Sequence, residues 1–254
     1  MRFVRFVSPK GPAWGRVDGD QVRPLSGAPW EGTDPAAGAA PLPRRSLSLL
    51  PPVTGKVAGI GRNYRAHAAE LGNEVPAEPL VFWKPSTSLL PHRGTVLVPR
   101  ESERVDYEGE LGVVLGRRVR RATPEEGREA ILGLVPALDV TARDLQKKDG
   151  QWWRAKGFDT FCPVGPAIET AADPADLLLE TLLCGAVVQS GRTSLMVFDV
   201  GTLVSWVSRA VTLEPGDLIL TGTPEGVGPL APGQTVEVRI EKVGRLAVSV
   251  ARES

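Results

Sequence analysis

Strand patterning is the sequence feature that most constrains the fold, because it dominates the chain while helical patterning is sparse. Apolar alternation or β-branched content marks LGVVLG (111–116), TVEVRIE (235–241) and LAVSVA (246–251) as strands. The last two are expected to face each other across a turn at residues 243–245, so the chain should end in a hairpin. Strands and helices do not alternate as a doubly wound sheet requires. The sequence therefore predicts a mainly-β fold with few helices, of the α+β class.

Three segments carry helix signals. Thr123, with Pro124 next and Glu126 three residues on, has the pattern of a capping box with proline at the first helical position. The dipeptide DP at 173–174 is expected to open a second helix, and the periodic run LVSWVSRAV (203–211) predicts a third.

The first 52 residues are expected to form a unit of their own. MRFVRFV alternates, and the segments WGRV and QVRPL flank an Asp18–Gly19 pair suited to a tight hairpin turn. Residues 26–52 are rich in proline, glycine and alanine without apolar periodicity, which is typical of an irregular connection. We therefore predict a small N-terminal β module with its linker in residues 1–52, followed by a larger domain in residues 53–254.

The overall charge and hydropathy argue against large anionic partners. Thirty basic and thirty acidic residues cancel, so neither nucleic acid nor a membrane surface is an expected partner. No run approaches the roughly 20 apolar residues that span a bilayer, and the amino terminus lacks the apolar stretch of a signal peptide. Cys162 and Cys184 lack metal-binding spacing and are expected to be reduced core thiols. A cytoplasmic, soluble protein with a small-molecule site is therefore expected.

Acidic residues stand at the ends of apolar strand segments. Asp106, Glu108 and Glu110 are spaced by two, so in an extended segment they leave the same face, and Asp139 ends the apolar run ILGLVPALD. A solvated strand face is the commoner meaning of such spacing. Carboxylates that emerge from core strands, however, are costly unless they are paired or bind a cation. Oxygen ligands with no histidine or cysteine nearby favour Mg²⁺ or Mn²⁺ first and Ca²⁺ second.

The segment KVAGIGRNYRAHAAELG contains a candidate acid–base pair. Asn63 is placed to cap a short helix, on which His67 and Glu70, at i and i+3, share one side. Glycines at 59, 61 and 72 bracket the segment and suit a lid. A lone histidine is more often a satisfied structural residue, so the spacing alone leaves both interpretations open.

Two lysines and a glycine-rich loop complete the candidates. Lys84 and Lys156 lie among apolar and aromatic neighbours, where a lysine needs an anion, a lowered pKa or a route to the surface. The loop GTPEGVG (222–228) follows the apolar strand DLILT and either offers N–H groups and a hydroxyl to a carboxylate or is a simple turn. Its spacing matches neither a phosphate-binding nor a dinucleotide-binding fingerprint.

Six segments, in this order, resemble the fumarylacetoacetate hydrolase family: GRNYRAHAAELG, PLVFWKPSTSL, DYEGELGVVLG, ALDVTARDLQ, RAKGFDTFCPVGPAI and TLEPGDLILTGTPEGVG. The similarity extends from about Lys56 to Val250 and looks closest to the short bacterial branch labelled 2-hydroxyhepta-2,4-diene-1,7-dioate isomerase. It implies a mixed β-roll catalytic domain after the small β module, and a homodimer.

The resemblance also implies roles for single residues. A divalent metal ion, Mg²⁺ with Mn²⁺ or Ca²⁺ as alternatives, would be held by Glu108, Glu110 and Asp139, with no ligand role for Asp106. The catalytic residues would be His67, Glu70 and Lys156, and the residues lining the substrate pocket would be Arg143, Gln146 and Thr223. Lys84 would have a structural or secondary role. The larger family members place a fourth acidic ligand shortly before the histidine, and no acid lies between positions 53 and 66, so fumarylacetoacetate hydrolysis itself is not expected.

The resemblance to that branch implies a metal-dependent isomerase or tautomerase of 2-hydroxy-dienedioates, as used in aromatic degradation. Its partner would be a small 2-oxo or 2-hydroxy carboxylic acid bound as a metal-stabilised enolate. An acylpyruvate hydrolase or oxaloacetate decarboxylase is the alternative, because an intact histidine–glutamate pair can activate water. A non-catalytic oxo-acid binding protein that retains the metal is an alternative of another class. All three share one site, so the sequence does not separate them.

Overall fold

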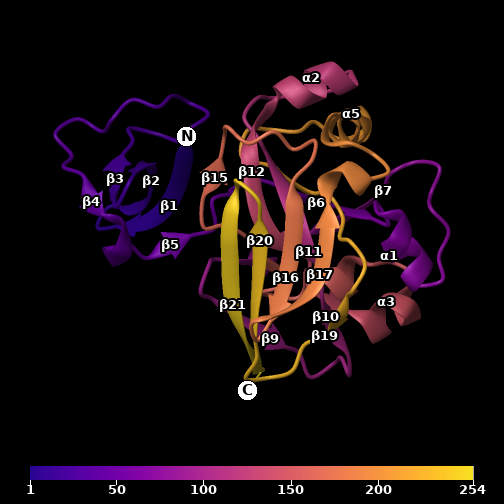
Figure 1. Cartoon of the computed structure of the whole chain (residues 1–254). Coiled ribbons are helices and arrows are strands. Elements are labelled where there is room, and N and C mark those ends of the chain that lie inside the picture. The colour runs from indigo at the N-terminus through magenta and orange to yellow at the C-terminus, as the bar shows by residue number, and fades with distance from the viewer. Residues whose placement is uncertain (254) are drawn as a thin grey trace.

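Sheets dominate the structure, a computed structural model that describes residues 1–253 (Figure 1). The predicted mainly-β fold of the α+β class is confirmed. The α-helices are α1 (Arg65–Glu70), α2 (Pro124–Glu129), α3 (Arg143–Asp149), α4 (Trp153–Gly157) and α5 (Val200–Ala210). The 3-10 helices are η1 (Arg44–Ser46), η2 (Ser86–Ser88) and η3 (Thr193–Leu195). None of the helices in residues 1–253 is long and apolar enough to cross a membrane.

The larger sheet carries the central strands of the molecule. Its hydrogen-bonded order is β4 (Leu42–Pro43), β3 (Gln21–Pro24), β2 (Gly11–Asp18), β1 (Arg2–Ser8), β15 (Ile168–Glu169), β12 (Ile131–Leu138), β11 (Gly109–Leu115), β18 (Leu218–Leu220), β6 (Val57–Gly61) and β7 (Leu80–Lys84), and β5 (Leu49–Leu50) pairs with β1. Every residue of β11 is buried, as are the last six of β12. This explains their nearly continuous apolar sequences, since such strands have neighbours on both faces.

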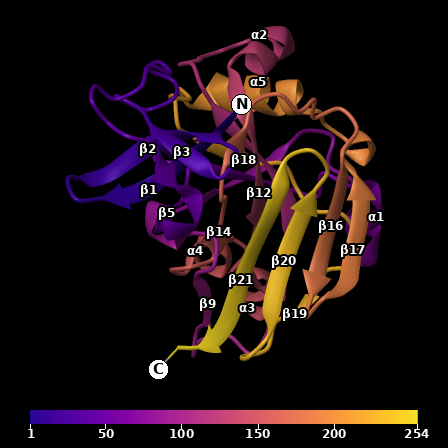
Figure 2. The same ribbon diagram turned by 60° about the vertical axis from the view of Figure 1, so that its left-hand side comes forward.

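A second sheet packs against the first and closes the core (Figures 1 and 2). Its order is β17 (Ala186–Arg192), β16 (Leu178–Leu183), β20 (Thr235–Ile240), β21 (Gly244–Arg252) and β9 (Thr95–Val98). The predicted hairpin of β20 and β21 is confirmed, but its turn spans residues 241–243 because Ile240 already pairs with Gly244. Two small sheets join β13 (Thr141–Ala142), β10 (Val105–Tyr107) and β19 (Gly228–Pro229), and β14 (Cys162–Pro163) with β8 (Leu89–Leu90).

The N-terminal strands lie at one side of the molecule but belong to the larger sheet (Figure 1). Strand β1 pairs with β15, and Phe3 and Trp14 share a core cluster with Val135 and Ile168 of the body. The β2–β3 turn is formed by residues 19 and 20, one position later than expected, because Asp18 already pairs within the strands. One sheet thus contains strands from both sides of residue 52. The division of the chain into two units at that residue remains a prediction.

Two of the three expected helices are present. The capping box at Thr123 is confirmed, since its side chain and that of Glu126 each accept the backbone N–H of the other. Helix α2 packs on α5, which Asp199 caps; a Cβ on Gly127 would lie 2.8 Å from the backbone oxygen of Gly201, so glycine permits this close crossing.

The helix expected at residues 173–174 is wrong. Asp173 accepts the N–H of Ala175 in a turn, and Thr193 binds the backbone of both Pro174 and Leu177. Strand β16 begins at the next residue, so no length remains for a helix. The proline here ends one segment and leads into a strand.

The cysteines are both free, but only one lies in the core. Cys162 is buried, and burial raises the pKa of its thiol to about 12. Cys184 is exposed in the turn between β16 and β17, at φ 50° beside Gly185, which corrects the expectation of two core thiols.

Candidate active site

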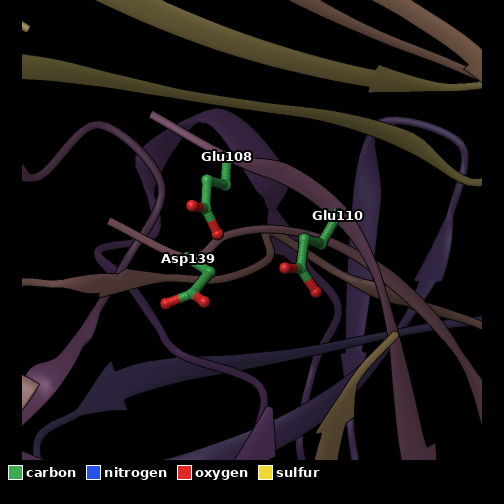
Figure 3. Close-up of side chains that lie close together, drawn as sticks. All are labelled: Glu108, Glu110 and Asp139. Carbon is green, nitrogen blue, oxygen red and sulfur yellow. The ribbon is translucent and has the colours of Figure 1, made fainter. Parts of the chain in front are cut away.

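Three carboxylates lie close together at one end of the two central strands β11 and β12 of the larger sheet. Glu108 directly precedes β11, Glu110 is the second residue of β11, and Asp139 directly follows β12. The strands are antiparallel with Gly109 opposite Leu138, so the start of one lies beside the end of the other. The N–H of Asp139 also donates to the backbone oxygen of Glu108 at 2.9 Å. Strand pairing, rather than sequence spacing, thus brings Asp139 to the two glutamates (Figure 3).

The carboxylates form a group that fits a divalent metal ion. One oxygen from each of Glu108, Glu110 and Asp139 lies within 4.8 Å of the others, and all three residues are buried (Figure 3). Burial and the negative charges of Asp139 and Glu108 raise the pKa of Glu110 well above its ordinary value. An oxygen-only set of three neighbouring carboxyl groups suits a hard cation.

Two buried lysines balance part of this charge. Lys156 on α4 donates to Glu108 at 2.8 Å, to Asp139 at 2.5 Å and to Thr141 at 2.8 Å, and Lys84 at the end of β7 donates to Asp139 at 2.5 Å. Both lysines are 3 % exposed, so neither reaches the surface. Burial acts to lower the pKa of Lys156, but Asp139 and Glu108 outweigh it and raise the pKa, so the amine stays protonated.

Asp106 lies apart from the metal-binding group. It belongs to β10 in a small sheet, whereas β11 begins after Glu108 in the larger sheet, so the expectation of one continuous strand face is wrong. Its carboxylate accepts from Arg104 and Arg143, each at 2.9 Å. Arg143, at the start of α3, also donates to Glu108 and, at 2.6 Å, to Gln146. Asp106 therefore positions an arginine that holds a candidate ligand.

The predicted acid–base pair lies on one side of α1. His67 is 5 % exposed, and its Nδ1 lies 3.5 Å from the carboxylate of Glu70 without a hydrogen-bond partner in the described residues. Burial lowers the pKa of His67 and outweighs the opposing charge of Glu108, so the imidazole is neutral near pH 7. A neutral imidazole can accept a proton.

The residues expected to cap and loosen α1 have other roles. Tyr64, not Asn63, stands at the cap position; Asn63 instead bonds the backbone of Phe198 and Thr221 and is fully buried. Gly59 and Gly61 lie in β6 rather than in hinges, and a Cβ there would collide with Phe82 and Trp152 respectively. Only Gly72, at φ +66°, has the backbone conformation of a flexible bracket. Gly59 and Gly61 are therefore required for close packing rather than for flexibility.

The glycine-rich loop after β18 binds protein carboxylates. The N–H of Gly222 donates to Glu110 at 2.7 Å, and that of Gly226 donates to Glu70 at 3.1 Å. The hydroxyl of Thr223 donates to the backbone of Gly109 at 2.8 Å. Two of the N–H groups expected to bind a substrate carboxylate thus hold a candidate ligand and a candidate catalytic residue.

One cavity brings nearly all the predicted residues together. Its volume is about 380 Å³, and the predicted residues that line it are His67, Glu70, Glu108, Glu110, Arg143, Gln146, Lys156 and Thr223. Asp139 and Lys84 do not line it, and both are buried, Asp139 fully. A cavity of this size suits a small organic acid.

Sequence reasoning missed several residues of this site. Arg62, Lys147 and Trp152 line the cavity, and the Arg62 guanidinium lies 5.9 Å from the centre of the Trp152 ring. Gln189 on β17 is 2 % exposed, accepts from Gly109 and donates to Thr223. Arg62 stands inside the histidine motif and Lys147 follows Gln146, so proximity along the chain was a usable signal. Gln189 had none, because a single glutamine on a strand does not reveal its face.

Comparison with known families agrees with this geometry. Residues 56–251 match the family described as fumarylacetoacetate (FAA) hydrolase C-terminal, and residues 1–52 match the family described as Rv2993c-like, N-terminal. Protein Rv2993c of Mycobacterium tuberculosis is 44 % identical over 100 % of this chain and 99 % of its own length. Mitochondrial oxaloacetate decarboxylase of Dictyostelium discoideum is 43 % identical over 73 % of this chain and 88 % of its own.

Solved structures give the same family. The 2-hydroxyhepta-2,4-diene-1,7-dioate isomerase of Mycobacterium marinum has a TM-score of 0.91 and 43 % identity, over 100 % of this chain and 99 % of that one. The fumarylpyruvate hydrolase of Pseudomonas aeruginosa, solved with Mn²⁺ and pyruvate, has a TM-score of 0.75 and 31 % identity, over 81 % and 92 % of the two chains. The chain therefore belongs to the fumarylacetoacetate hydrolase family, whose members include isomerases, hydrolases and decarboxylases.

Proposed function

We propose that the protein is a divalent-metal-dependent isomerase of 2-hydroxy-dienedioates, related in activity to 2-hydroxyhepta-2,4-diene-1,7-dioate isomerase. The observation that carries the proposal is that one small cavity is lined by a neutral histidine, a protonated lysine and two of three clustered carboxylates. Converting a 2-hydroxy-2,4-diene to a 2-oxo-3-ene moves one proton from oxygen to carbon. It therefore needs a base, a hydrogen-bond donor and a way to accommodate negative charge.

Each of these three requirements can be assigned to residues of the candidate site. His67, neutral and with Nδ1 facing Glu70, is the group that accepts the 2-hydroxyl proton and returns it to carbon. Lys156 stays protonated and its three N–H groups are directed at Glu108, Asp139 and Thr141, so it supplies positive charge at the cavity wall rather than acting as the base. Arg143, held by Asp106 and Gln146, is fixed to bind a carboxylate. A divalent ion held by Glu108, Glu110 and Asp139 would polarise the carboxylate and C2 oxygens of the substrate.

The rim of the cavity supports a substrate with two carboxylates. Arg62 and Lys147 line it, and neither lies within 4.0 Å of a carboxylate in the described residues. The floor supplies Arg143 and the metal ligands for one end of a substrate. The two rim cations are then available for the carboxylate at the other end.

The test is an assay of 2-hydroxyhepta-2,4-diene-1,7-dioate, followed by the loss of the ultraviolet absorbance of its conjugated dienol. We expect turnover with Mg²⁺ or Mn²⁺, loss of turnover on thorough chelation, and restoration by added metal. Lys156→Ala should remove turnover, whereas Lys148→Ala, which changes an exposed lysine on α3, should not. Turnover that survives chelation would refute the metal-dependent mechanism.

A second candidate is C–C bond hydrolysis of acylpyruvates or decarboxylation of oxaloacetate. The observation that favours it is the placement of Glu70 beside His67, with the Glu70 carboxylate also held by Gly226. An oriented histidine suits the activation of water, which simple enol–keto exchange does not require. His67→Ala separates the two: an isomerase loses enol–keto exchange, whereas a hydrolase keeps exchange and loses cleavage. Tight oxalate binding with no turnover of any of these acids would instead indicate a binding protein.

The assembly that we propose is a homodimer, as the family resemblance implies. Light scattering coupled to gel filtration should give twice the 27.1 kDa mass of one chain. A monomeric mass at micromolar concentration would contradict this.

A further inference from the structure

A second cavity, larger than the candidate active site, lies between the N-terminal strands and the body. Its volume is about 1010 Å³. It is lined by η1 and its neighbours from the N-terminal side, by residues 92–93 after β8, and by the start of β21. None of the residues that line the candidate active site lines it.

Cationic side chains dominate this cavity. The basic residues that line it are Arg2, Arg44, Arg45, Arg93, Arg245 and His92, against the single acid Asp20. Arg2 is neutralised by Glu169 at 2.7 Å, and Arg245 has a long contact of 3.8 Å to Glu237. No described carboxylate lies within 4.0 Å of Arg44, Arg45 or Arg93. Like charges gathered in this way repel unless an anion joins them.

Backbone contacts hold the centre of this group in place. The N–H of Arg93 donates to the backbone oxygen of Ala247 at 2.7 Å, and the N–H of Ala247 donates to Nδ1 of His92 at 3.0 Å. Because Nδ1 accepts, the neutral imidazole carries its proton on Nε2, which is then a donor. Burial, first, and the charges of Arg93, Arg245 and Arg44 lower the pKa of His92, and the same three arginines line the cavity with it.

The backbone at Arg93 is strained. Its φ is 67°, in the left-handed region that arginine rarely adopts, although the neighbouring residue is a glycine. A non-glycine residue kept in this conformation costs free energy, and such residues are concentrated at binding sites. Arg93 is therefore an arginine where glycine would be the relaxed choice.

We propose that this cavity is a binding site for a small, multiply charged anion, of the phosphate or tricarboxylate class, held by Arg44, Arg93, Arg245 and Nε2 of His92. An arginine guanidinium group can bind two oxygens of either a phosphoryl or a carboxylate group. The site is therefore expected to select ligands by negative charge and size rather than by the type of anionic group. The ligand bridges the N-terminal strands and the body, because Arg44 comes from η1 and the other three groups come from residues after 90.

The experiment is calorimetric titration of the full-length, metal-free protein with inorganic pyrophosphate and, separately, with citrate at matched ionic strength. We expect one binding site per chain for at least one anion, and the tighter of the two identifies the phosphoryl or the tricarboxylate source. Arg93→Gly should weaken binding by about tenfold or more, since it removes a charged hydrogen-bond donor. Glycine also relieves the left-handed backbone, so this variant should fold and melt no lower than the native protein.

Two further variants locate the binding. Arg120→Ala removes an exposed arginine outside both cavities and should leave the affinity for the anion unchanged. Arg62→Ala removes an arginine that lines only the candidate active site, and it should also leave the affinity for the anion unchanged. Binding that Arg93→Gly leaves unchanged, or that Arg62→Ala abolishes, would overturn the proposal, as would the absence of binding by both anions at millimolar concentration.

Discussion

At the scale of single residues, Glu110 is expected to couple the proposed metal binding to pH. Its folded-state pKa is raised, chiefly by burial, so the folded protein retains its proton to a higher pH than the unfolded chain does. The stabilisation from that proton is complete below the unfolded pKa of about 4.3 and is lost as pH rises through the folded pKa. A divalent ion has to displace the proton, so metal affinity should increase with pH.

The measurement is the shift in melting temperature on adding Mg²⁺ or Mn²⁺ at several pH values between 6 and 8.5. We expect the shift to grow with pH and to be small in Glu110→Gln. A shift of equal size at every pH would contradict the raised pKa.

Arg62 should give the protein a preference for substrates with two carboxylates over substrates with one. Arg62→Ala is expected to raise KM for a dicarboxylic substrate about tenfold or more, from the loss of one charge-assisted contact, and to leave kcat within about twofold. An analogue that lacks the distal carboxylate should show no such change, and Lys148→Ala is the matched control. An equal effect of Arg62→Ala on both substrates would show that Arg62 acts on the fold of the site instead.

The same scale shows where sequence reasoning succeeded and failed. The need for a counter-charge at Glu108, Glu110 and Asp139 could be anticipated because they stand beside core strands, and the structure brings them together, but their assignment as metal ligands came from resemblance and stays a prediction. The exclusion of Asp106 came from resemblance, and its physical reason, a change of sheet at Glu108, is a long-range pairing that local spacing does not encode. Asn63 was misread for a similar reason, since its partners Phe198 and Thr221 are more than 130 residues away in sequence.

At the scale of elements, the packing of β6 on β7 depends on glycine. A Cβ on Gly59 would lie 2.1 Å from the Phe82 ring, so Gly59→Ala should destabilise the protein by about 1–3 kcal/mol. Chemical denaturation would measure this loss. Adding Phe82→Leu should restore part of it, because the smaller side chain vacates the contact. A loss that the second substitution leaves unchanged would contradict the steric explanation.

Elements with strong local signals were predicted and those set by their surroundings were not. Helix α2 has its own capping box and α5 its own periodicity, so both were visible. The short helices α3 and α4 span seven and five residues and lack a side-chain cap, so their form depends on packing around the carboxylates. The dipeptide at 173–174 carried a helix signal that the neighbouring strand overrode.

At the scale of the whole molecule, the N-terminal strands and the body should unfold together. Phe3, Trp14 and Leu25 share one core cluster with Val135 and Ile168, and β1 pairs with β15. Calorimetry is expected to give one transition whose calorimetric and van't Hoff enthalpies agree. Hydrogen exchange of β1 that is lost well before that of β12 would show instead that the predicted module melts alone.

Lys84 and Lys156 have a consequence for the energetic cost of burying the carboxylates. Between them the two ammonium groups engage both oxygens of Asp139 and one of Glu108. Each ion pair offsets part of the desolvation cost of its partners, and removing one lysine would leave a buried carboxylate uncompensated. The two lysines are therefore requirements of the folded core as well as neighbours of the candidate site.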